Sequence, residues 1–374
     1  MRFSSLAIAA ITGLAMLLPA LSSQAAAADG PVTFKDITGQ SISLPQPAKR
    51  ILLAEGRQIF AISLIHPDPV SVLAGWLGDM RRSDPKTYEL YRNKFPAIES
   101  IPVLGMGNDG SFSVERAIAA KPDVAVLGMG FAPGGHASEI AKQLEAAGIP
   151  VVFTDFFVDP FRNMLPSMRI LGHVLGRDAQ AAAYIAFYQE HMDRIAARLS
   201  QHIGKPPSVL VETHAGMGEC CFSPGKKNFG EYIAFAGGDS ISAGAIPGPN
   251  GHLSLEYVIA RNPDIYVATG GSHLAAIGGL VIGPGYDLTE IRSRLAKLAA
   301  RPGFSAINAV QTGRVHGLFH NIISTPVNIV AIEALAKWIN PSLFGDVDPE
   351  RTMADINAKF LAVPLQGIYL VDLK

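Results

Sequence analysis

Apolar and polar residues follow one another along this chain in two alternating patterns. Short apolar runs such as RILLAE (50–55), PDVAVLG (122–128) and PDIYVATG (263–270) predict buried strands. Between these runs, apolar residues recur at helical spacing, as in EIAKQLEAAG (139–148). An exception is the region 76–102, where aromatic and charged residues predict irregular structure. Strands that alternate with helices indicate an α/β fold with a mainly parallel sheet.

The second half of the chain repeats the pattern of the first. ERAIAAKPDVAVLG (115–128) aligns with EYVIARNPDIYVATG (256–270), and the Glu and Asp of one segment lie 141 positions from those of the other. Between the halves, residues 177–201 predict one long helix. We therefore expect two similar lobes with mainly parallel sheets, bridged by one long helix. The expected boundaries are an N-terminal lobe over 29–160, a connecting long helix over 161–202, and a C-terminal lobe with C-terminal helices over 203–374.

The first 28 residues have a pattern of their own. An Arg precedes an apolar run (6–21), and small residues follow this run up to Ala28. The run is interrupted by Thr, Gly and Pro and is shorter than the about 20 apolar residues that span a bilayer. This pattern is typical of a signal peptide. We expect a signal peptide over residues 1–28, cut between Ala25 and Ala28, and an exported mature protein.

The composition narrows the function classes. Hydrophobic residues make up 48% and charged residues 17% of the 374 residues, and the formal net charge is −1. Positive and negative residues are interspersed, so no basic face for nucleic acid is expected. We predict no nucleic-acid partner.

The spacing of GMGNDG (105–110) resembles a dinucleotide-binding fingerprint. That motif requires an acidic residue at the end of the second strand, about 20 residues further on. Here Asp123 opens its strand instead of closing it, and Ser113 is expected to cap the intervening helix. The chain also has no G-x-S-x-G elbow, complete phosphate loop or closely spaced histidine set. We therefore predict no catalytic residues, no cofactor and no metal site.

The two cysteines, Cys220 and Cys221, are adjacent. Ordinary disulfide geometry places the Cα atoms about 5.5 Å apart, which neighbouring residues rarely allow. Two thiols are also too few for a four-ligand zinc site. The sequence favours two partly buried free thiols, with a strained disulfide or a soft metal contact as alternatives.

Several segments together resemble one protein family. The likeness is carried by VTFKDITGQSISLPQPAKRILLAEG (32–56), SVERAIAAKPDVAVLG (113–128), FGEYIAFAGGDSIS (229–242), SLEYVIARNPDIYVATG (254–270) and HGLFHNIISTPVNIVAIEALAKWINPSLF (316–344). In this order they resemble the periplasmic binding proteins that serve ABC importers of iron–siderophore complexes, haem and cobalamin. The resemblance implies the class III periplasmic binding fold, two α/β lobes bridged by a long helix.

The same resemblance implies a function without catalysis. It implies a periplasmic monomer that binds a small-molecule iron chelate and delivers it to an inner-membrane ABC permease and its ATPase. The family docks each lobe on the permease through a surface Glu, and the matching positions here are Glu115 and Glu256. The helix macrodipole alone also favours Glu at a helix start, but the equivalent positions in two lobes favour docking.

The ligand is expected between the lobes, where the strands of open α/β sheets end. A ferric siderophore needs guanidinium groups to pair with its oxygen atoms and aromatic faces to stack on. We predict ligand contacts from candidate residues that follow the expected strands, namely Arg57, Trp76, Arg81, Arg82, Met129, Phe131, His214, Phe222, His273 and His320.

These predictions have alternatives. Arg81 and Arg82 also fit a solvated face, and aromatic candidates also fit loop packing. His214 and His320 could ligate a metal centre through imidazole, which favours haem, so haem or cobalamin is the alternative cargo to a ferric siderophore. Two other classes remain open: a periplasmic redox protein or enzyme that uses the cysteine pair, and a sensor module built on the same fold.

Overall fold

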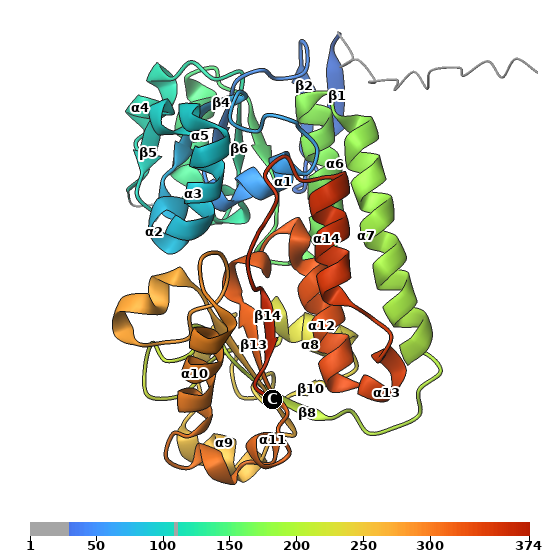
Figure 1. Cartoon of the computed structure of the whole chain (residues 1–374). Helices are drawn as coiled ribbons and strands as arrows, with labels where there is room; N and C mark the ends of the chain where they lie inside the picture. The colour runs from blue at the N-terminus through green and yellow to red at the C-terminus, as the bar shows by residue number, and fades with distance from the viewer. Residues whose placement is uncertain (1–29, 108–110) are drawn as a thin grey trace, which may run out of the picture.

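Two lobes, each built around a five-stranded sheet, make up the chain (Figure 1). The computed structural model describes residues 30–107 and 111–374, so the predicted signal peptide lies outside the described residues. The N-terminal sheet has the order β5-β4-β3-β6-β7 with parallel neighbours throughout. Its strands are β3 (Ile51–Leu53), β4 (Leu73–Leu77), β5 (Val103–Gly105), β6 (Val124–Leu127) and β7 (Val151–Phe153).

The C-terminal sheet has the order β10-β8-β12-β13-β14. Its neighbours are parallel except that β14 runs antiparallel to β13. The strands are β8 (Ser208–Glu212), β10 (Asp239–Ser240), β12 (Ile265–Gly270), β13 (Val315–Phe319) and β14 (Leu370–Asp372). Two short antiparallel ribbons accompany the sheets, β1 (Val32–Lys35) with β2 (Ser41–Leu44), and β9 (Phe222–Pro224) with β11 (Asn250–His252). The predicted α/β fold with two mainly parallel sheets is confirmed.

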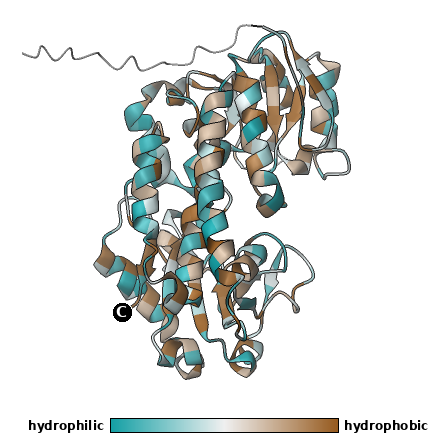
Figure 2. Ribbon diagram, turned by 90° about the vertical axis from the view of Figure 1, so that its right-hand side faces the viewer, coloured by the Kyte–Doolittle hydropathy of each residue, from teal (hydrophilic) through white to brown (hydrophobic). Residues whose placement is uncertain are grey.

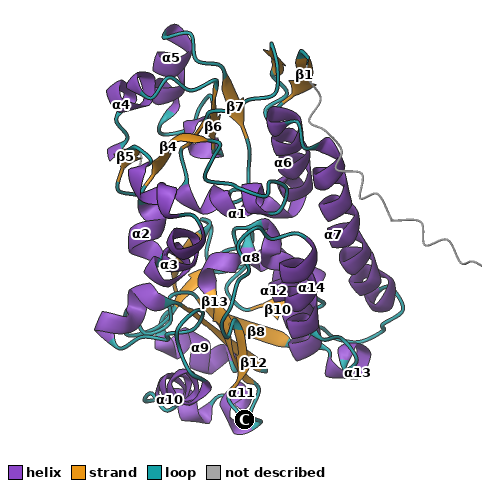
Figure 3. Cartoon of the chain, turned by 45° about the horizontal axis from the view of Figure 1, so that its top comes forward, coloured by secondary structure: helices purple, strands orange, loops and turns teal. Residues whose placement is uncertain are grey.

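Hydrophobic residues concentrate in the strands of both lobes (Figure 2). Every residue of β6, β12 and β13 is buried, which is the pattern of parallel strands covered on both faces by helices. The helices lie around the strands in each lobe (Figure 3). In the N-terminal lobe they are α1 (Ile59–Ser63), α4 (Val114–Ala119) and α5 (Ser138–Ala146), with the 3-10 helices η1 (Gly56–Gln58) and η4 (Met129–Phe131).

The prediction of irregular structure over residues 76–102 is wrong. This region completes β4 and then forms α2 (Asp79–Ser83), α3 (Pro85–Lys94) and η2 (Pro96–Ser100). Asp84 caps α3 by accepting a hydrogen bond from the backbone N–H of Thr87 at 3.2 Å, and Pro85 occupies the first helical position. The buried residues of α3 are a Thr and two Tyr, so its inner face lacks the aliphatic stripe that marks a helix in the sequence.

The connection between the lobes consists of two helices. Helix α6 (Pro160–Leu175) ends at Gly176, whose φ of 61° is the left-handed conformation that glycine favours at a helix end. Helix α7 (Asp178–Leu199) then runs from the N-terminal lobe along the side of the C-terminal lobe (Figure 1). The predicted long connecting helix therefore corresponds to α7, with α6 packed against it.

The C-terminal lobe holds the remaining helices. They are α8 (Phe229–Phe235), α9 (Leu255–Arg261), η5 (Ser272–Ile277), α10 (Leu288–Ala299), η6 (Phe304–Ala306), α11 (Asn308–Gln311), η7 (His320–Ile322), η8 (Pro326–Asn328), α12 (Ile329–Ile339), α13 (Pro341–Phe344) and α14 (Pro349–Lys359). None of the helices within the described ranges combines the length and apolarity that a membrane span requires.

Helix α7 is held on the C-terminal lobe by hydrogen bonds of the buried Asn328 side chain, here called the polar centre. The hydroxyl of Tyr188 in α7 donates to Oδ1 of Asn328 at 2.9 Å. The amide nitrogen of Asn328 donates to the hydroxyl of Tyr232 in α8 at 2.7 Å and to the carbonyl of Ile323 at 3.3 Å. Asn328 is fully buried, so these bonds are shielded from water and fix the position of α7 on this lobe.

The last residues of the chain form a second connection between the lobes. After α14, residues 360–369, here called the C-terminal strap, return to the N-terminal lobe before the chain enters β14. The backbone N–H of Ala362 donates to the carbonyl of Ser63 at 2.8 Å, and Nζ of Lys94 donates to the carbonyl of Ala362. Leu361, Val363 and Leu365 are buried, so side chains of the strap belong to the hydrophobic core.

Replacing the buried amide tests the role of this polar centre. We expect Asn328→Ala to lower the free energy of unfolding by about 3 kcal/mol, because it leaves two buried tyrosine hydroxyls without a partner. Tyr188→Phe removes one hydrogen bond and should cost about 1 kcal/mol. Urea denaturation of both variants and of the double variant measures the coupling. Additive losses would contradict a shared network.

Candidate functional site

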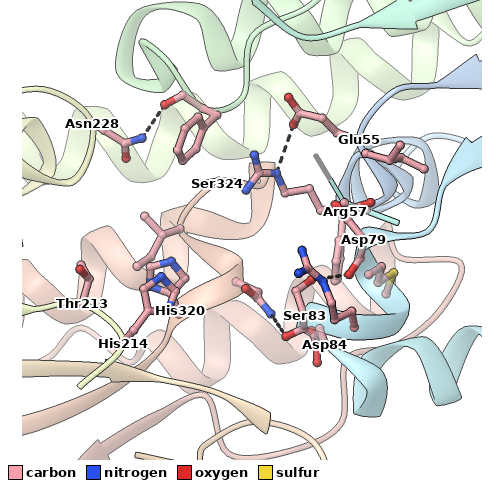
Figure 4. Close-up of a pocket in the computed structure, with 18 of the residues that line it drawn as sticks. Glu55, Arg57, Asp79, Ser83, Asp84, Thr213, His214, Asn228, His320 and Ser324 are labelled. Carbon is pink, nitrogen blue, oxygen red and sulfur yellow. Dashed lines mark hydrogen bonds and ion pairs between the residues drawn. The ribbon is translucent and has the colours of Figure 1, made fainter. Parts of the chain in front are cut away.

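A pocket of about 380 Å³ lies between the two lobes. Residues that follow β3 and β4 of the N-terminal lobe face residues that follow β8 and β13 of the C-terminal lobe, which is where open α/β sheets build their sites. Its titratable lining residues include Glu55, Arg57, Asp79, Asp84, His214 and His320 (Figure 4). The site therefore joins charged groups from one lobe to imidazoles from the other.

Arg57 stands on the N-terminal side of the pocket, in η1, which follows β3. Its Nε lies 3.2 Å from Oε2 of Glu55, and its guanidinium lies 4.7 Å from the centre of the Phe157 ring. Asn228 of the C-terminal lobe donates to the backbone carbonyl of Phe157. The arginine is thus held in place by an ion pair and by an aromatic face, and the loop that carries this face contacts the other lobe.

Asp79 and Arg82 lie on helix α2, which follows β4. Oδ1 of Asp79 accepts a hydrogen bond from the backbone N–H of Gly56 at 2.7 Å, and burial raises the pKa of this carboxyl. The guanidinium of Arg82 lies against Gly107, where a Cβ would come within 2.6 Å of Nη2. Gly107 also has a φ of 124°, so a side chain there would strain the backbone, and the guanidinium of Arg82 would have to move.

Asp84 lies at the junction of α2 and α3 and is only 2% exposed. Its Oδ1 caps α3, while its Oδ2 is buried without a hydrogen-bond partner. Burial raises the pKa of this carboxyl. From the C-terminal lobe, the side chain of Asn321 reaches across and donates to the neighbouring carbonyl of Ser83 at 3.4 Å. Asp84 therefore belongs to the place where the two lobes meet.

His214 and His320 form the C-terminal side of the pocket. Their ring centres are 3.9 Å apart. The hydroxyl of the fully buried Thr269 orients both residues, since it accepts the backbone N–H of His214 at 3.1 Å and lies 2.9 Å from Nδ1 of His320. Nδ1 of His214 in turn lies 2.8 Å from Nε2 of His273. These contacts leave Nε2 of His214 and of His320 as the remaining ring nitrogens.

The surroundings of all three imidazoles favour their neutral form, because each pKa is lowered. Burial lowers the pKa of His214 to about 4, and proximity to His273 adds to this shift. Burial also lowers the pKa of His273. The pKa of His320 is held well below its ordinary value by burial and by His214, His273 and Arg57. Neutral imidazole nitrogens can accept hydrogen bonds or ligate a metal, whereas imidazolium cannot.

The described residues contain no group of three or more His, Cys, Asp or Glu side chains arranged to hold a metal ion. His214 and His273 direct nitrogen atoms at each other, so these rings do not converge on a common centre. What the pocket offers is two neighbouring imidazoles, Phe222 and a pair of guanidinium groups.

Five of the predicted ligand-binding residues line this pocket: Arg57, Arg82, His214, Phe222 and His320. Phe222 begins β9 and stacks on His214 with ring centres 6.5 Å apart. His273 does not line the pocket but supports His214 from behind through the contact described above. The reasoning from strand ends thus brought together residues that are up to 263 positions apart in the chain.

The other predicted residues lie elsewhere. Trp76 is fully buried because β4 continues through Leu77, which makes Trp76 a strand residue that stacks on Tyr88 instead of a loop residue. Arg81 lies 5.0 Å from the Tyr88 ring centre and donates to the carbonyl of Ile98. The structure places these side chains in the packing of α3 and not in the pocket.

Met129 and Phe131 also lie outside the pocket lining. They belong to η4, which turns back onto the N-terminal lobe after β6. Phe131 is 2% exposed and contacts Phe112 edge to face at 5.9 Å, and Met129 packs against the same cluster. Their position after a strand therefore does not indicate a pocket residue, because η4 directs both side chains into the N-terminal lobe.

The sequence analysis missed several pocket residues, among them Glu55, Asp79, Asp84, Phe157 and Asn321. Glu55 lies two residues after the end of β3, so its position after a strand end marks it in the same way as Arg57. Asp84 precedes a proline, which is a helix-start signal that was not used. Asn321 and Phe157 carry no local signal, because only the lobe arrangement brings them to the pocket.

Cys220 and Cys221 are joined by a disulfide, with Cα atoms 3.1 Å apart. The prediction of two free thiols is therefore wrong. General disulfide geometry made a bond between neighbours improbable but did not forbid it. Cys221 exchanges backbone hydrogen bonds with Leu253 at 3.0 Å in both directions, so the pair is anchored directly before the pocket residue Phe222.

The neutral histidine cluster predicts loss of stability in acid. The unfolded chain takes up protons at these histidines with a pKa of about 6.5, whereas folded His214 resists protonation down to about 4. Between these values the unfolded state binds more protons, so the free energy of unfolding falls as pH falls. We expect a smaller decrease in melting temperature from pH 7 to pH 4.5 for His214→Gln than for the unmodified protein.

The exposed His202 provides the control for this experiment. His202→Gln should leave the acid sensitivity unchanged, because its imidazole is solvated in both states. Differences between each variant and the parent remove the contribution of carboxylates that titrate in the same range. Equal acid sensitivity of His214→Gln and the parent would contradict a buried neutral His214.

Comparison with known proteins agrees with this architecture. The model of a family described as periplasmic binding protein matches residues 66–319. No curated protein matches the chain. Among solved structures, the TroA-like periplasmic binding protein FepB from Veillonella parvula is 26% identical, with a TM-score of 0.85, and the alignment covers 92% of this chain and 100% of that one.

Two more distant structures share the fold. A periplasmic heme binding protein from Pseudomonas aeruginosa is 20% identical with a TM-score of 0.55, and the match covers 79% of this chain and 94% of that one. CeuE from Helicobacter pylori, in a complex with nickel and histidine, is 16% identical with a TM-score of 0.63 over 90% of this chain and 96% of that one. The family match over most of the chain and the two-lobed architecture establish that this chain belongs to the periplasmic binding proteins and has their class III fold.

Proposed function

We propose that the protein captures a ferric siderophore in the pocket between its lobes and delivers it to an inner-membrane ABC permease. The family consists of solute-binding proteins of such importers, and the finer assignment rests on the chemistry of the pocket. This assignment is supported by one observation: guanidinium groups, aromatic faces and imidazoles from both lobes line the same pocket. A volume of about 380 Å³ suits a compact metal chelate.

Haem is the second candidate cargo, because His214 and His320 both line the pocket and in each the Nδ1 contact leaves Nε2 as the remaining ring nitrogen. Imidazole nitrogen is a common axial ligand of haem iron. The contacts of Thr269 with both residues would also orient the imidazoles for ligation, because metal-ligating histidines are commonly oriented by hydrogen bonds from their surroundings. A siderophore with open coordination positions could use the same nitrogens.

Delivery is proposed to depend on Glu115 and Glu256. Both are exposed and lie in the first turn of α4 and α9, after the helix-capping residues Ser113 and Ser254. An isoleucine three residues after each glutamate is also exposed, at 41% for Ile118 and 40% for Ile259. Each lobe therefore presents an acidic group beside an apolar side chain at an equivalent place. A partner with two similar sites, each with a cation, would complement this pair.

The ligand assignment predicts a thermal shift. We expect a ferric siderophore at about 100 times its dissociation constant to add about 2.7 kcal/mol to the free energy of unfolding, which raises the melting temperature by several degrees. The panel should contain ferric hydroxamate, catecholate and carboxylate siderophores, hemin, cobalamin, and zinc and manganese salts. His320→Gln should reduce the shift and His202→Gln should not.

A shift with hemin or cobalamin alone would retain the solute-binding function and change the cargo. A new absorption band of hemin that His320→Gln removes would identify imidazole ligation. If none of the metal complexes in the panel shifts the melting temperature, the proposed function is overturned.

The docking assignment predicts a loss of uptake without a loss of binding. We expect the double variant Glu115→Arg, Glu256→Arg to lower ligand uptake in a complemented deletion strain about tenfold or more, because each lobe would present a cation to a cation. Binding of the ligand to the purified variant should be unchanged. Glu145→Arg, at another exposed position of the N-terminal lobe, is the matched control. Normal uptake by the double variant would refute docking through these residues.

A further inference from the structure

The two imidazoles that line the pocket, those of His214 and His320, lie side by side and each keep one ring nitrogen for a ligand (Figure 4). Both side chains are half-buried, and the contacts described above occupy Nδ1 of each ring. Among the described residues, neither Nε2 belongs to the polar atoms that are both sealed from solvent and without a partner. A ligand in the pocket therefore meets two accessible ring nitrogens.

A neutral imidazole has one nitrogen that carries a proton and one that bears a lone pair. The neutral form is favoured in both pocket rings, because burial lowers the pKa of His214 and of His320. The hydrogen bond that one ring nitrogen makes sets which of the two carries the proton. The partners of the Nδ1 atoms therefore determine what each Nε2 offers to a ligand.

Thr269 fixes the proton position in His320. Its hydroxyl is fully buried and has two neighbours, the backbone N–H of His214 at 3.1 Å and Nδ1 of His320 at 2.9 Å. Because the N–H only donates, Nδ1 of His320 is the acceptor that the described residues offer to the hydroxyl proton. The opposite arrangement would leave this buried proton without an acceptor, which is unfavourable. The proton of His320 therefore lies on Nε2, and this nitrogen is a donor.

His273 fixes the proton position in His214 in the opposite sense. Its Nε2 lies 2.8 Å from Nδ1 of His214, so one of these nitrogens donates to the other. Burial lowers the pKa of His273, and the backbone of Ser83 opposes this shift as a hydrogen-bond acceptor. Since Nε2 of His273 faces His214, this acceptor favours a proton on Nδ1 of His273. Nε2 of His273 then accepts from Nδ1 of His214, and Nε2 of His214 bears the lone pair.

This chain of contacts crosses the boundary between the lobes. Helix α2 of the N-terminal lobe ends at Ser83 and packs against η5 of the C-terminal lobe, which carries His273. Asn321 of the C-terminal lobe also donates to the carbonyl of Ser83, at 3.4 Å. The lone pair that His214 presents to the pocket therefore depends on contact between the two lobes.

We propose that the two pocket imidazoles have opposite roles: Nε2 of His320 donates a hydrogen bond to an oxygen of the ligand, and Nε2 of His214 gives its lone pair to an electron-pair acceptor, such as a metal ion with an open coordination position. The ring centres are 3.9 Å apart, so one ligand meets both nitrogens. This inference rests on the proposed function. It makes His214, and not His320, the imidazole that ligates a metal without first moving a proton.

The positions of the imidazole protons test the proposal directly. Nuclear magnetic resonance of the purified protein with isotope-labelled histidine distinguishes a ring nitrogen that carries a proton from one that bears a lone pair. At neutral pH we expect the proton on Nε2 in His320 and on Nδ1 in both His214 and His273. The variants His214→Gln, His273→Gln and His320→Gln assign the signals. A lone pair on Nε2 of His320, or a proton on Nε2 of His214, would overturn the assignment.

Two further variants address the two partners separately. Thr269→Val keeps the shape of the side chain but lacks the hydroxyl, so we expect His320 to lose its preference for a proton on Nε2. Thr269→Ser keeps the hydroxyl and should keep this preference. His273→Phe removes the acceptor of His214, so a proton should appear on Nε2 of His214 while His320 is unchanged. An unchanged His320 in Thr269→Val would contradict the role of Thr269, and the spectrum of the parent decides the proposal even if this variant does not fold.

Hemin is the probe for the lone pair, because haem iron accepts imidazole as an axial ligand. We expect His214→Gln to abolish the absorption change that hemin shows with the parent, whereas His320→Gln and the control His202→Gln retain it. Loss of this change in His320→Gln, with retention in His214→Gln, would reverse the two roles and overturn the proposal. The proton positions are measured without a ligand, so their outcome is independent of the thermal-shift panel that tests the proposed function.

Discussion

The anchoring of helix α7 at Asn328 is the constraint on which the arrangement of the two lobes depends. One buried amide joins the connecting helix to α8 and to the segment between β13 and α12. A second buried contact, Nδ1 of His191 in α7 at 2.6 Å from Oε1 of Glu333 in α12, lies one turn further along the same helix. One face of the connector is thus packed into the C-terminal lobe, so the lobes are joined by an anchored helix and not by a free linker.

Contacts between the lobes surround the pocket. Interlobe contacts such as Asn321 to Ser83 and Asn228 to Phe157 already exist around it. Thr269 holds the two pocket imidazoles in place from inside the C-terminal sheet. Contacts that hold lining side chains in one position reduce the conformational freedom that these side chains lose when a ligand binds.

The sequence predicted the fold well because its main signals are periodic. Apolar strand runs alternate with amphipathic helices, and the 141-residue repeat placed Glu115 and Glu256 at equivalent helix starts, as the structure has them. The prediction for residues 76–102 is wrong because the inner face of α3 is lined by Thr and Tyr. Neither residue type contributes clearly to a hydrophobic pattern.

The site was predictable only in part, for a geometric reason. Strand ends located Arg57, His214 and His320, since the ends of parallel strands share one edge of a sheet. The direction of a side chain depends on where the strand stops. Strand β4 ends at Leu77, two residues beyond the expected end at Gly75, and this difference places Trp76 in the core and not in the pocket. Residues such as Asn321 and Phe157, which only the arrangement of the lobes brings to the pocket, leave no trace in a local pattern.

The C-terminal strap also has a consequence for how the chain is made. Ala362 supplies the partner of the Ser63 carbonyl in the N-terminal lobe, and β14 supplies the edge of the C-terminal sheet. Neither lobe has all of these contacts until the strap and β14 have been synthesised. A nascent chain therefore stays incompletely folded until this segment emerges, and an incompletely folded polypeptide can be threaded across a membrane.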